Sequence, residues 1–308
     1  MNNFSFNRFG QTFRWVLVTH FQTFLAFTAG CAAAMFLLEM IIIALNIHPD
    51  GGNYISVLYS DLSSFCAIFL IIYALVAIST LFSYYLKKPQ REAFLMLPST
   101  NLEKFLAVVI YVTVVWSLAG FMAFAVGDTL RMAVRALAFG NEWYSLVPKV
   151  LDMFGEMIPP FDEGMMIHTI SYKVCAPIVM IGLLIWIHSI YILGGTLLRK
   201  YAFVVSSLVI ISAFLLMTWL IFKFNINAFY VDTVIDGQSL EALRQAGALT
   251  DGEIPAESIQ VLHKVGVMGY FLTVALPILS IFNYWASFHN FKGFQLITNK
   301  WTNYDFHK

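Results

Sequence analysis

The chain has few charged residues and few cysteines. Charged residues make up 12% of the 308 residues, and the formal net charge is zero. This balance lacks the strongly basic character that attracts nucleic acid, so no nucleic-acid partner is expected. Cys31, Cys66 and Cys175 fall in apolar stretches and lack the short spacing of metal ligands. They are expected to be buried thiols, with neither a disulfide framework nor a metal site.

The sequence motifs that mark nucleotide and catalytic sites are also missing. The chain has no Gly-x-x-x-x-Gly-Lys-Ser/Thr loop to hold phosphates, so any ATP hydrolysis must occur in a partner. It has no His-Glu-x-x-His pair for zinc and no Gly-x-Ser-x-Gly nucleophile turn. The chain is therefore expected to be no enzyme and to hold no cofactor.

Hydrophobic sequence is abundant, at 59% of the residues. A helix that crosses a membrane needs about 20 mostly apolar residues. No alternating, strand-like pattern competes with the long apolar runs, and helices satisfy their backbone hydrogen bonds inside lipid. The sequence predicts an all-α integral membrane protein, one transmembrane domain over residues 1–308, with six spans at about residues 22–46, 62–86, 105–126, 174–198, 202–222 and 265–288.

The distribution of cations predicts the orientation of these spans. Cytoplasmic segments of membrane proteins are enriched in Lys and Arg. With both termini cytoplasmic, the inside segments hold eleven of the 18 cations: Arg8, Arg14, Lys87, Lys88, Arg91, Lys104, Arg199, Lys200, Lys292, Lys300 and Lys308. The acidic residues gather on the other side. We therefore expect a multi-pass protein of the cytoplasmic membrane.

The segments that flank the spans carry further local signals. The aromatic and basic stretch 4–20 suits a helix lying in the inner membrane interface before the first span. The apolar run continues about fourteen residues beyond Cys31, which argues against a cleaved signal peptide. Outer loops are expected at 127–173, with a helix-period stretch at 128–138, and at 223–264, with a short helix at 239–247. These loops form either a small lid or simple connections.

The segment 87–104, between the second and third spans, is the most informative. Pro89 allows a short helix to begin there, and Pro98 ends it. Thr100 followed by Glu103 matches a capping box, so the third span should start sharply near residue 101. The segment combines cations with an apolar run from Phe94 to Leu97. It suits either docking of a cytosolic partner or a helix lying on the membrane surface.

The same residues carry a resemblance. A span that ends in Lys-Lys, followed by Arg-Glu-Ala-Phe-Leu-Met-Leu-Pro-Ser-Thr-Asn-Leu-Glu-Lys-Phe-Leu over 91–106, resembles the corresponding loop of ABC-2-type transporter permeases. In that family the loop is a coupling helix that contacts a separate ATPase subunit, and two membrane subunits assemble. The resemblance implies an ATPase-coupling role for Arg91, Glu92, Phe94, Leu95, Leu97, Pro98, Ser99, Thr100, Glu103 and Lys104. The outer loop at 127–173 is longer than in many members.

Two titratable residues lie inside the predicted spans. A carboxylate inside a membrane is costly and marks a functional hypothesis, and Glu39 is the one placed deep in a span. It either lines a substrate path, pairs helices, or reaches the outer interface. His188 has no partner at ligand spacing, so a hydrogen-bonded packing role is favoured over a substrate path.

Together these patterns predict a permease subunit of an ATP-driven exporter. Its expected partners are a cytosolic ABC ATPase, a second permease copy or paralogue, and the lipid bilayer. A membrane scaffold that anchors a cytosolic partner without transport is the alternative. An intramembrane enzyme that uses Glu39 or His188 is a third hypothesis, which no catalytic motif supports. The sequence names no substrate.

Overall fold

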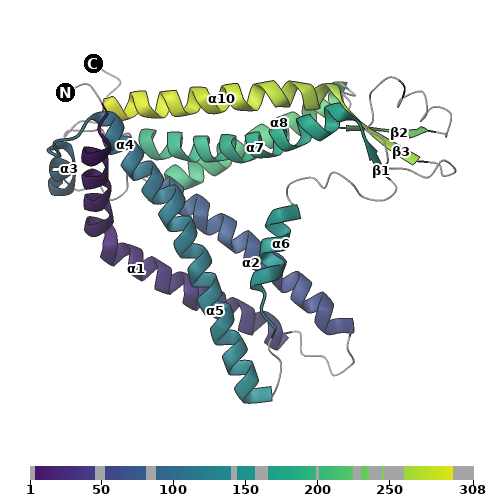
Figure 1. Cartoon of the computed structure of the whole chain (residues 1–308), viewed down its shortest axis with the longest axis horizontal. Coiled ribbons are helices and arrows are strands. Elements are labelled where there is room, and N and C mark those ends of the chain that lie inside the picture. The colour runs from purple at the N-terminus through teal and green to yellow at the C-terminus, as the bar shows by residue number, and fades with distance from the viewer. Residues whose placement is uncertain are drawn as a thin grey trace. The chain divides into compact units, whose positions relative to one another are not determined.

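Six long apolar helices dominate the structure, a computed structural model. It describes residues 4–45, 53–80, 88–139, 144–156, 166–198, 201–224, 230–235, 245 and 260–293. Among these residues, six helical stretches are long and apolar enough to cross a membrane. They are α1 (Phe6–Leu45), α2 (Asn53–Ser79), the continuous run of α4 (Asn101–Ile110), η2 (Tyr111–Val115) and α5 (Trp116–Phe139), α7 (Ile170–Leu197), α8 (Ala202–Phe224) and α10 (Val267–Lys292) (Figure 1). The predicted all-α class with six spans is confirmed.

The first helix is longer than a membrane crossing. α1 has 40 residues, and a helix of that length extends about 60 Å, whereas the hydrocarbon core is about 30 Å thick. The sequence analysis predicted a separate interfacial helix before the first span. The structure joins the two because no proline interrupts residues 6–45. Figure 1 shows α1 bending after its first turns, which leaves its N-terminal part free to follow an interface.

The third span also exceeds its predicted length. α4, η2 and α5 run without interruption from Asn101 to Phe139, with one short π-helical stretch at η2. The predicted helical stretch at 128–138 is confirmed, but it continues the span and is not a separate element of an outer loop. Asp128 and Arg131, which lie within this stretch, pair with each other inside the helix.

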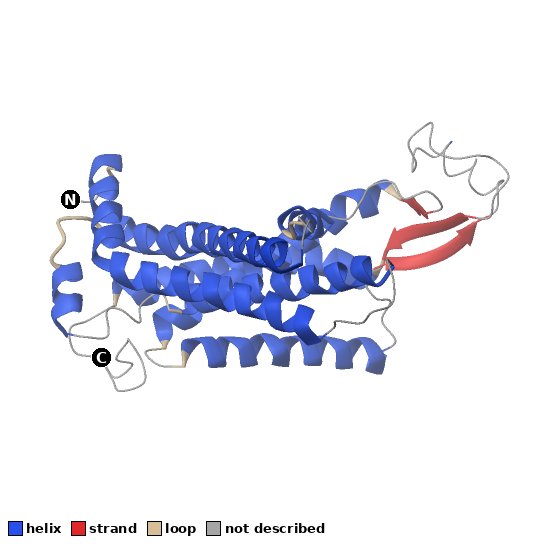
Figure 2. Ribbon diagram, turned by 90° about the horizontal axis from the view of Figure 1, so that it is seen from below, coloured by secondary structure: helices blue, strands red, loops and turns tan. Residues whose placement is uncertain are grey.

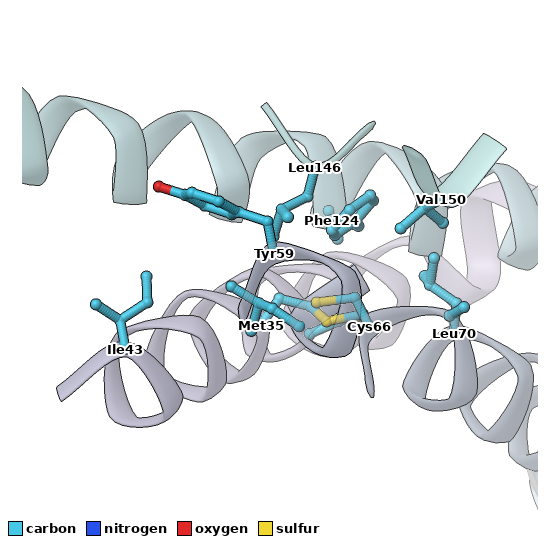
Figure 3. Close-up of a cluster of buried hydrophobic side chains, with 12 residues drawn as sticks. Met35, Ile43, Tyr59, Cys66, Leu70, Phe124, Leu146 and Val150 are labelled. Carbon is cyan, nitrogen blue, oxygen red and sulfur yellow. The ribbon is translucent and has the colours of Figure 1, made fainter. Parts of the chain in front are cut away.

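The chain forms two compact units. Unit 1 consists of Met1–Gly155, Tyr191–Val205 and Ala286–Lys308, and unit 2 of Glu156–Ile190 and Ser206–Trp285. The core of unit 1 lies where α1, α2, α5 and the short helix α6 (Val147–Glu156) meet. Figure 3 shows its buried side chains, which include Met35, Cys66, Phe124, Leu146 and Val150.

Unit 2 contains a small sheet outside the apolar helices, which the sequence analysis did not predict. Its strands are β1 (Met166–His168), β2 (Tyr230–Ile235) and β3 (Gln260–Val265), in the order β1-β3-β2 (Figure 2). β1 is parallel to β3, and β2 is antiparallel to it. The strands are short, and their partners come from distant loops. The helix predicted at 239–247 lies outside the described residues, apart from Gln245.

Candidate functional site

The segment between the second and third spans folds as predicted. Lys88–Leu95 forms the helix α3, and Pro89 is tolerated in its first turn because that position needs no backbone donor. Thr100 Oγ1 accepts a hydrogen bond from Glu103 N at 3.2 Å. Glu103 Oε2 accepts one from Thr100 N at 2.8 Å, which completes the capping box. The predicted start of the third span is confirmed to the residue.

Glu103 also binds the beginning of the first helix. Its Oε1 accepts hydrogen bonds from Ser5 N at 2.8 Å and from Arg8 Nη2 at 3.0 Å. The carboxylate is fully buried, so its charge is compensated by Arg8 and by backbone donors. One side chain therefore fixes the start of α4 to the start of α1.

Lys104, the next residue, holds the end of α3. Its Nζ donates a hydrogen bond to the carbonyl oxygen of Leu95 at 2.8 Å. A cation at the C-terminus of a helix satisfies an open carbonyl and interacts favourably with the helix dipole. The short helix thus ends on a buried ammonium group from the third span.

The inner face of α3 carries Arg91 and Phe94, which are 2% and 0% exposed. The Phe94 ring lies 6.0 Å from the ring of Trp15 in α1 and 6.2 Å from that of Phe291 in α10. Phe94 and Arg91, two of the residues to which the resemblance assigns ATPase coupling, are therefore covered within the chain itself. Both side chains point inward, because residues three apart share one face of a helix.

The outer face of α3 carries exposed apolar residues. Pro89, Ala93 and Met96 are exposed, and their spacing of four and then three residues places them on one helix face. Met96 N donates to Glu92 O at 3.0 Å, so Met96 continues the helical geometry. Its side chain is 84% exposed. Met96 is not among the residues that the resemblance singles out, although its spacing from Pro89 and Ala93 places it on the same helix face.

The ten predicted coupling residues thus fall into three groups by exposure. Buried ones hold the segment in place, half-buried ones border it, and one is exposed. The buried residues are Arg91, Phe94, Glu103 and Lys104. The half-buried residues are Glu92, Leu95, Leu97, Ser99 and Thr100, and the exposed residue is Pro98.

A second candidate site surrounds Glu39 in unit 1. Glu39 is fully buried, and its Oε2 lies 2.9 Å from Arg131 Nε as an ion pair. Its Oε1 lies 3.8 Å from the thiol sulfur of Cys66, a weak hydrogen-bond donor. Arg131 Nε also donates to Asp128 Oδ1 at 3.1 Å. Burial among these groups favours helix pairing by Glu39 over an exposed position at the membrane interface.

The second carboxylate of this network fixes the segment that leads into α6. Asp128 Oδ2 accepts hydrogen bonds from Ser145 Oγ at 2.7 Å and Leu146 N at 3.0 Å. Arg131 Nη2 donates to the carbonyl oxygen of Tyr144. The network therefore joins α1 to α5 and attaches the start of α6 to both. The sequence analysis missed Asp128 and Arg131, although two opposite charges three residues apart in an apolar helix are a pairing signal.

His188 takes part in pairing α7 with α10 inside unit 2. Its Nδ1 lies 2.6 Å from the hydroxyl oxygen of Tyr284. One residue away on each helix, Asn283 Nδ2 donates to Ser189 Oγ at 3.0 Å. Adjacent polar contacts of this kind join helices in an apolar environment. The geometry agrees with the favoured packing role of His188.

Neither metal-ligand geometry among the described residues nor similarity to known proteins assigns a function to these sites. Among the side chains that the structure describes, no group of three or more His, Cys, Asp or Glu residues is placed to hold a metal ion. Comparisons with protein-family models, with curated proteins and with solved structures find no match to this chain.

Proposed function

We propose that the chain is the permease subunit of an ATP-driven exporter of the ABC type. In this proposal a separate cytosolic ATPase docks on α3, and two copies, or one copy and a relative, enclose the transport path in the cytoplasmic membrane. The single observation that carries the proposal is the outer face of α3, where the exposed apolar residues Pro89, Ala93 and Met96 lie in a segment rich in cations.

This surface has the properties of a docking element. Exposed apolar residues outside a membrane span commonly mark a contact with another protein, and a helix presented to a groove is a recurrent mode of recognition. The helix is already fixed by Phe94 on its inner face and by Lys104 at its end. A partner would therefore lose little free energy in ordering it, which favours tight binding.

The contacts around α3 also supply a route for movement. Lys104 joins α3 to the third span, and the adjacent Glu103 joins that span to α1. Farther along the same two helices, Glu39 and Arg131 join them again. A force applied to α3 would therefore act on α1 and on the α4–α5 helix together, as coupling between ATP hydrolysis and the spans requires.

The test combines site-specific cross-linking with ATP turnover. A photoreactive amino acid at position 96, introduced in cells of the source organism, should capture a protein that contains a phosphate-binding Gly-x-x-x-x-Gly-Lys-Ser/Thr loop. The same amino acid at Trp219, an exposed position in the C-terminal half of the apolar helix α8, is the matched control and should not capture it. The captured ATPase should change its turnover when mixed with the purified chain.

A charged substitution separates docking from folding. Met96→Asp should abolish the effect on ATP turnover and leave the thermal unfolding of the permease unchanged, because Met96 is 84% exposed. Phe94→Ala should lower the unfolding free energy by about 3–5 kcal/mol, the usual cost of truncating a buried aromatic side chain. Capture at position 96 of a protein without a nucleotide site would favour the scaffold alternative, and capture of lipid only would favour a helix that lies on the membrane surface without a partner.

A further inference from the structure

The short helix α6 packs against membrane-spanning helices of unit 1, although its residues belong to a predicted outer loop. Leu146, just before α6, and Val150 are completely buried in the core that α1, α2 and α5 form (Figure 3). Phe154, one turn farther along, lines a small apolar cavity together with Leu70 of α2 and Ser117 of α5. α6 therefore contacts the spans from its start to its last turn.

These contacts begin at one end of the apolar span of α2 and reach its middle. The ring of Tyr144, shortly before α6, lies 4.6 Å from the ring of Tyr59, the first residue of that span. Leu70, which lines the same cavity as Phe154, is the twelfth of the 21 residues in the span. The ten residues of α6 extend about 15 Å, which is half of a hydrocarbon core of about 30 Å. α6 thus enters the membrane and ends near its middle.

The third span gives the same depth independently. Ser117, at the far end of α6, is the seventeenth of the 37 residues of Asn101–Leu137. Asp128 and Arg131, which bind the segment before α6, lie nearer to the end of this helix. Since α3 follows the other end of α2, α6 enters from the side of the membrane opposite α3.

The face of α6 that is turned away from the core carries an acidic residue at this depth. Pro148, Asp152 and Gly155 are exposed, and their spacing of four and then three residues places them on one helix face. No residue in the described part of the chain pairs with Asp152. Charged side chains at membrane depth almost always face the interior of a bundle or a water-filled cavity. Lipid is therefore a poor environment for this face.

We propose that α6 is a re-entrant helix whose exposed face lines a water-filled cavity, open on the side of the membrane opposite α3. A helix end leaves its last carbonyl groups without intrahelical partners. Inside a membrane such backbone is tolerated where protein covers it or where it lines water. Water in one cavity would solvate both the end of α6 and the carboxylate of Asp152.

In the proposed exporter, this cavity is the outer part of the transport path, and that role alone rests on the proposed function. The re-entrant position of α6 rests on contacts inside unit 1. The two therefore fail separately. Absence of ATPase capture at position 96 would count against the exporter and would leave the cavity unaffected.

Cysteine accessibility tests the cavity in the full chain, reconstituted in lipid nanodiscs so that both sides are open to reagent. In a variant without native cysteines, Asp152→Cys should react with a small, charged thiol reagent. Ile68→Cys is the matched control, because Ile68 is an exposed apolar residue at the same depth of α2. Asp152→Cys should react at least about ten times faster than Ile68→Cys, because the thiolate is the reactive form and apolar surroundings suppress it.

Labelling in intact cells tests the side on which the cavity opens. With the same reagent, which does not cross membranes, only one of Asp152→Cys and Met96→Cys should react before the cells are permeabilised. Reaction of both in intact cells would overturn an opening opposite α3.

The size of the reagent separates a cavity from a helix that lies outside the membrane. A thiol reagent linked to a large polymer should react with Lys264→Cys, at an exposed position of β3, and should not react with Asp152→Cys. Gly155→Cys should behave like Asp152→Cys, and it keeps the carboxylate and meets open space within 4 Å, so it serves if Asp152→Cys folds poorly. Reaction of these α6 variants with the polymer reagent would place α6 outside the membrane and overturn the proposal. So would reaction with the small reagent as slow as that of Ile68→Cys, because the face would then lie against lipid or protein.

Discussion

At the scale of single residues, the buried network of unit 1 has unequal numbers of charges. Glu39 and Asp128 are two carboxylates, and both lie against the one guanidinium of Arg131. Asp128 receives further hydrogen bonds from Ser145 and Leu146, whereas among the described residues Glu39 has the weak thiol donor Cys66 as its one partner besides Arg131. Both carboxylates therefore need the Arg131 guanidinium to compensate their negative charge. Arg131 needs one carboxylate, and Asp128 supplies it when the charge of Glu39 is removed.

This inequality predicts different costs for substitutions in the network. Arg131→Met leaves two buried carboxylates without a cation and should lower the unfolding free energy by about 3–5 kcal/mol. Glu39→Gln keeps a hydrogen-bonding group and leaves Arg131 paired with Asp128, so it should stay within about 1 kcal/mol of the wild type. Unfolding in detergent, followed by tryptophan fluorescence, measures both.

Glu39→Leu is the control for this comparison, because it removes the hydrogen bond as well as the charge. Its loss of stability should fall between those of the other two variants. If Glu39→Gln destabilises the chain as strongly as Arg131→Met, the charge balance of the network has been assigned incorrectly.

At the scale of elements, α1 and α5 lie close together at a glycine, Gly127. A Cβ atom on Gly127 would lie 3.0 Å from the carbonyl oxygen of Ala32 and 3.2 Å from Phe36 N, both backbone atoms of α1. Backbone atoms of a helix cannot move away as the end of a flexible side chain can. The absence of a side chain at Gly127 therefore brings the two helices into the distance at which Glu39 meets Arg131.

Substitution of this glycine tests the contact. Gly127→Ala should destabilise unit 1 by about 1–3 kcal/mol, the usual cost of overpacking. Gly30→Ala, in α1, meets open space within 4 Å and gains helix propensity, so it should be neutral or stabilising by up to about 1 kcal/mol. Denaturation of both variants in detergent gives the difference. Equal stabilities would contradict the close approach of the helices.

At the scale of the whole molecule, the cation distribution predicts the orientation, and exposed positions make it testable. Met96 lies in the predicted cytoplasmic segment, and Lys264 lies in the predicted outer one. In a variant without native cysteines, Met96→Cys should react with a membrane-impermeant reagent only after the cells are permeabilised. Lys264→Cys should react in intact cells, because the two positions are separated by the membrane.

The cysteine-free variant used for labelling needs a conservative substitution at Cys66. Cys66 contacts Glu39, so Cys66→Ser, which keeps a donor group, is preferable to alanine there. Labelling of Met96→Cys in intact cells would contradict the orientation. Labelling of both positions from the same side would contradict the six-span arrangement itself.

The sequence by itself determined the membrane class, the six spans and the sharp start of the third span. These features depend on local properties, namely the length of apolar runs and the spacing of Thr100 and Glu103, which act on neighbouring residues. The sequence also indicated that a short helix precedes Pro98. It left open which face of that helix lies outward, because an apolar residue such as Phe94 suits an internal core and an external contact equally well.

The tertiary structure alone decided which distant residues meet. Phe94 turns inward because Trp15 and Phe291 lie beside it, and this leaves Met96 as the exposed apolar residue. Glu39 meets Arg131 because Gly127 allows α1 and α5 to approach. Strand register brings β1, from one predicted outer loop, beside β3 from the other. Contacts of this kind depend on packing and register between segments far apart in the chain, which no local pattern of residues encodes.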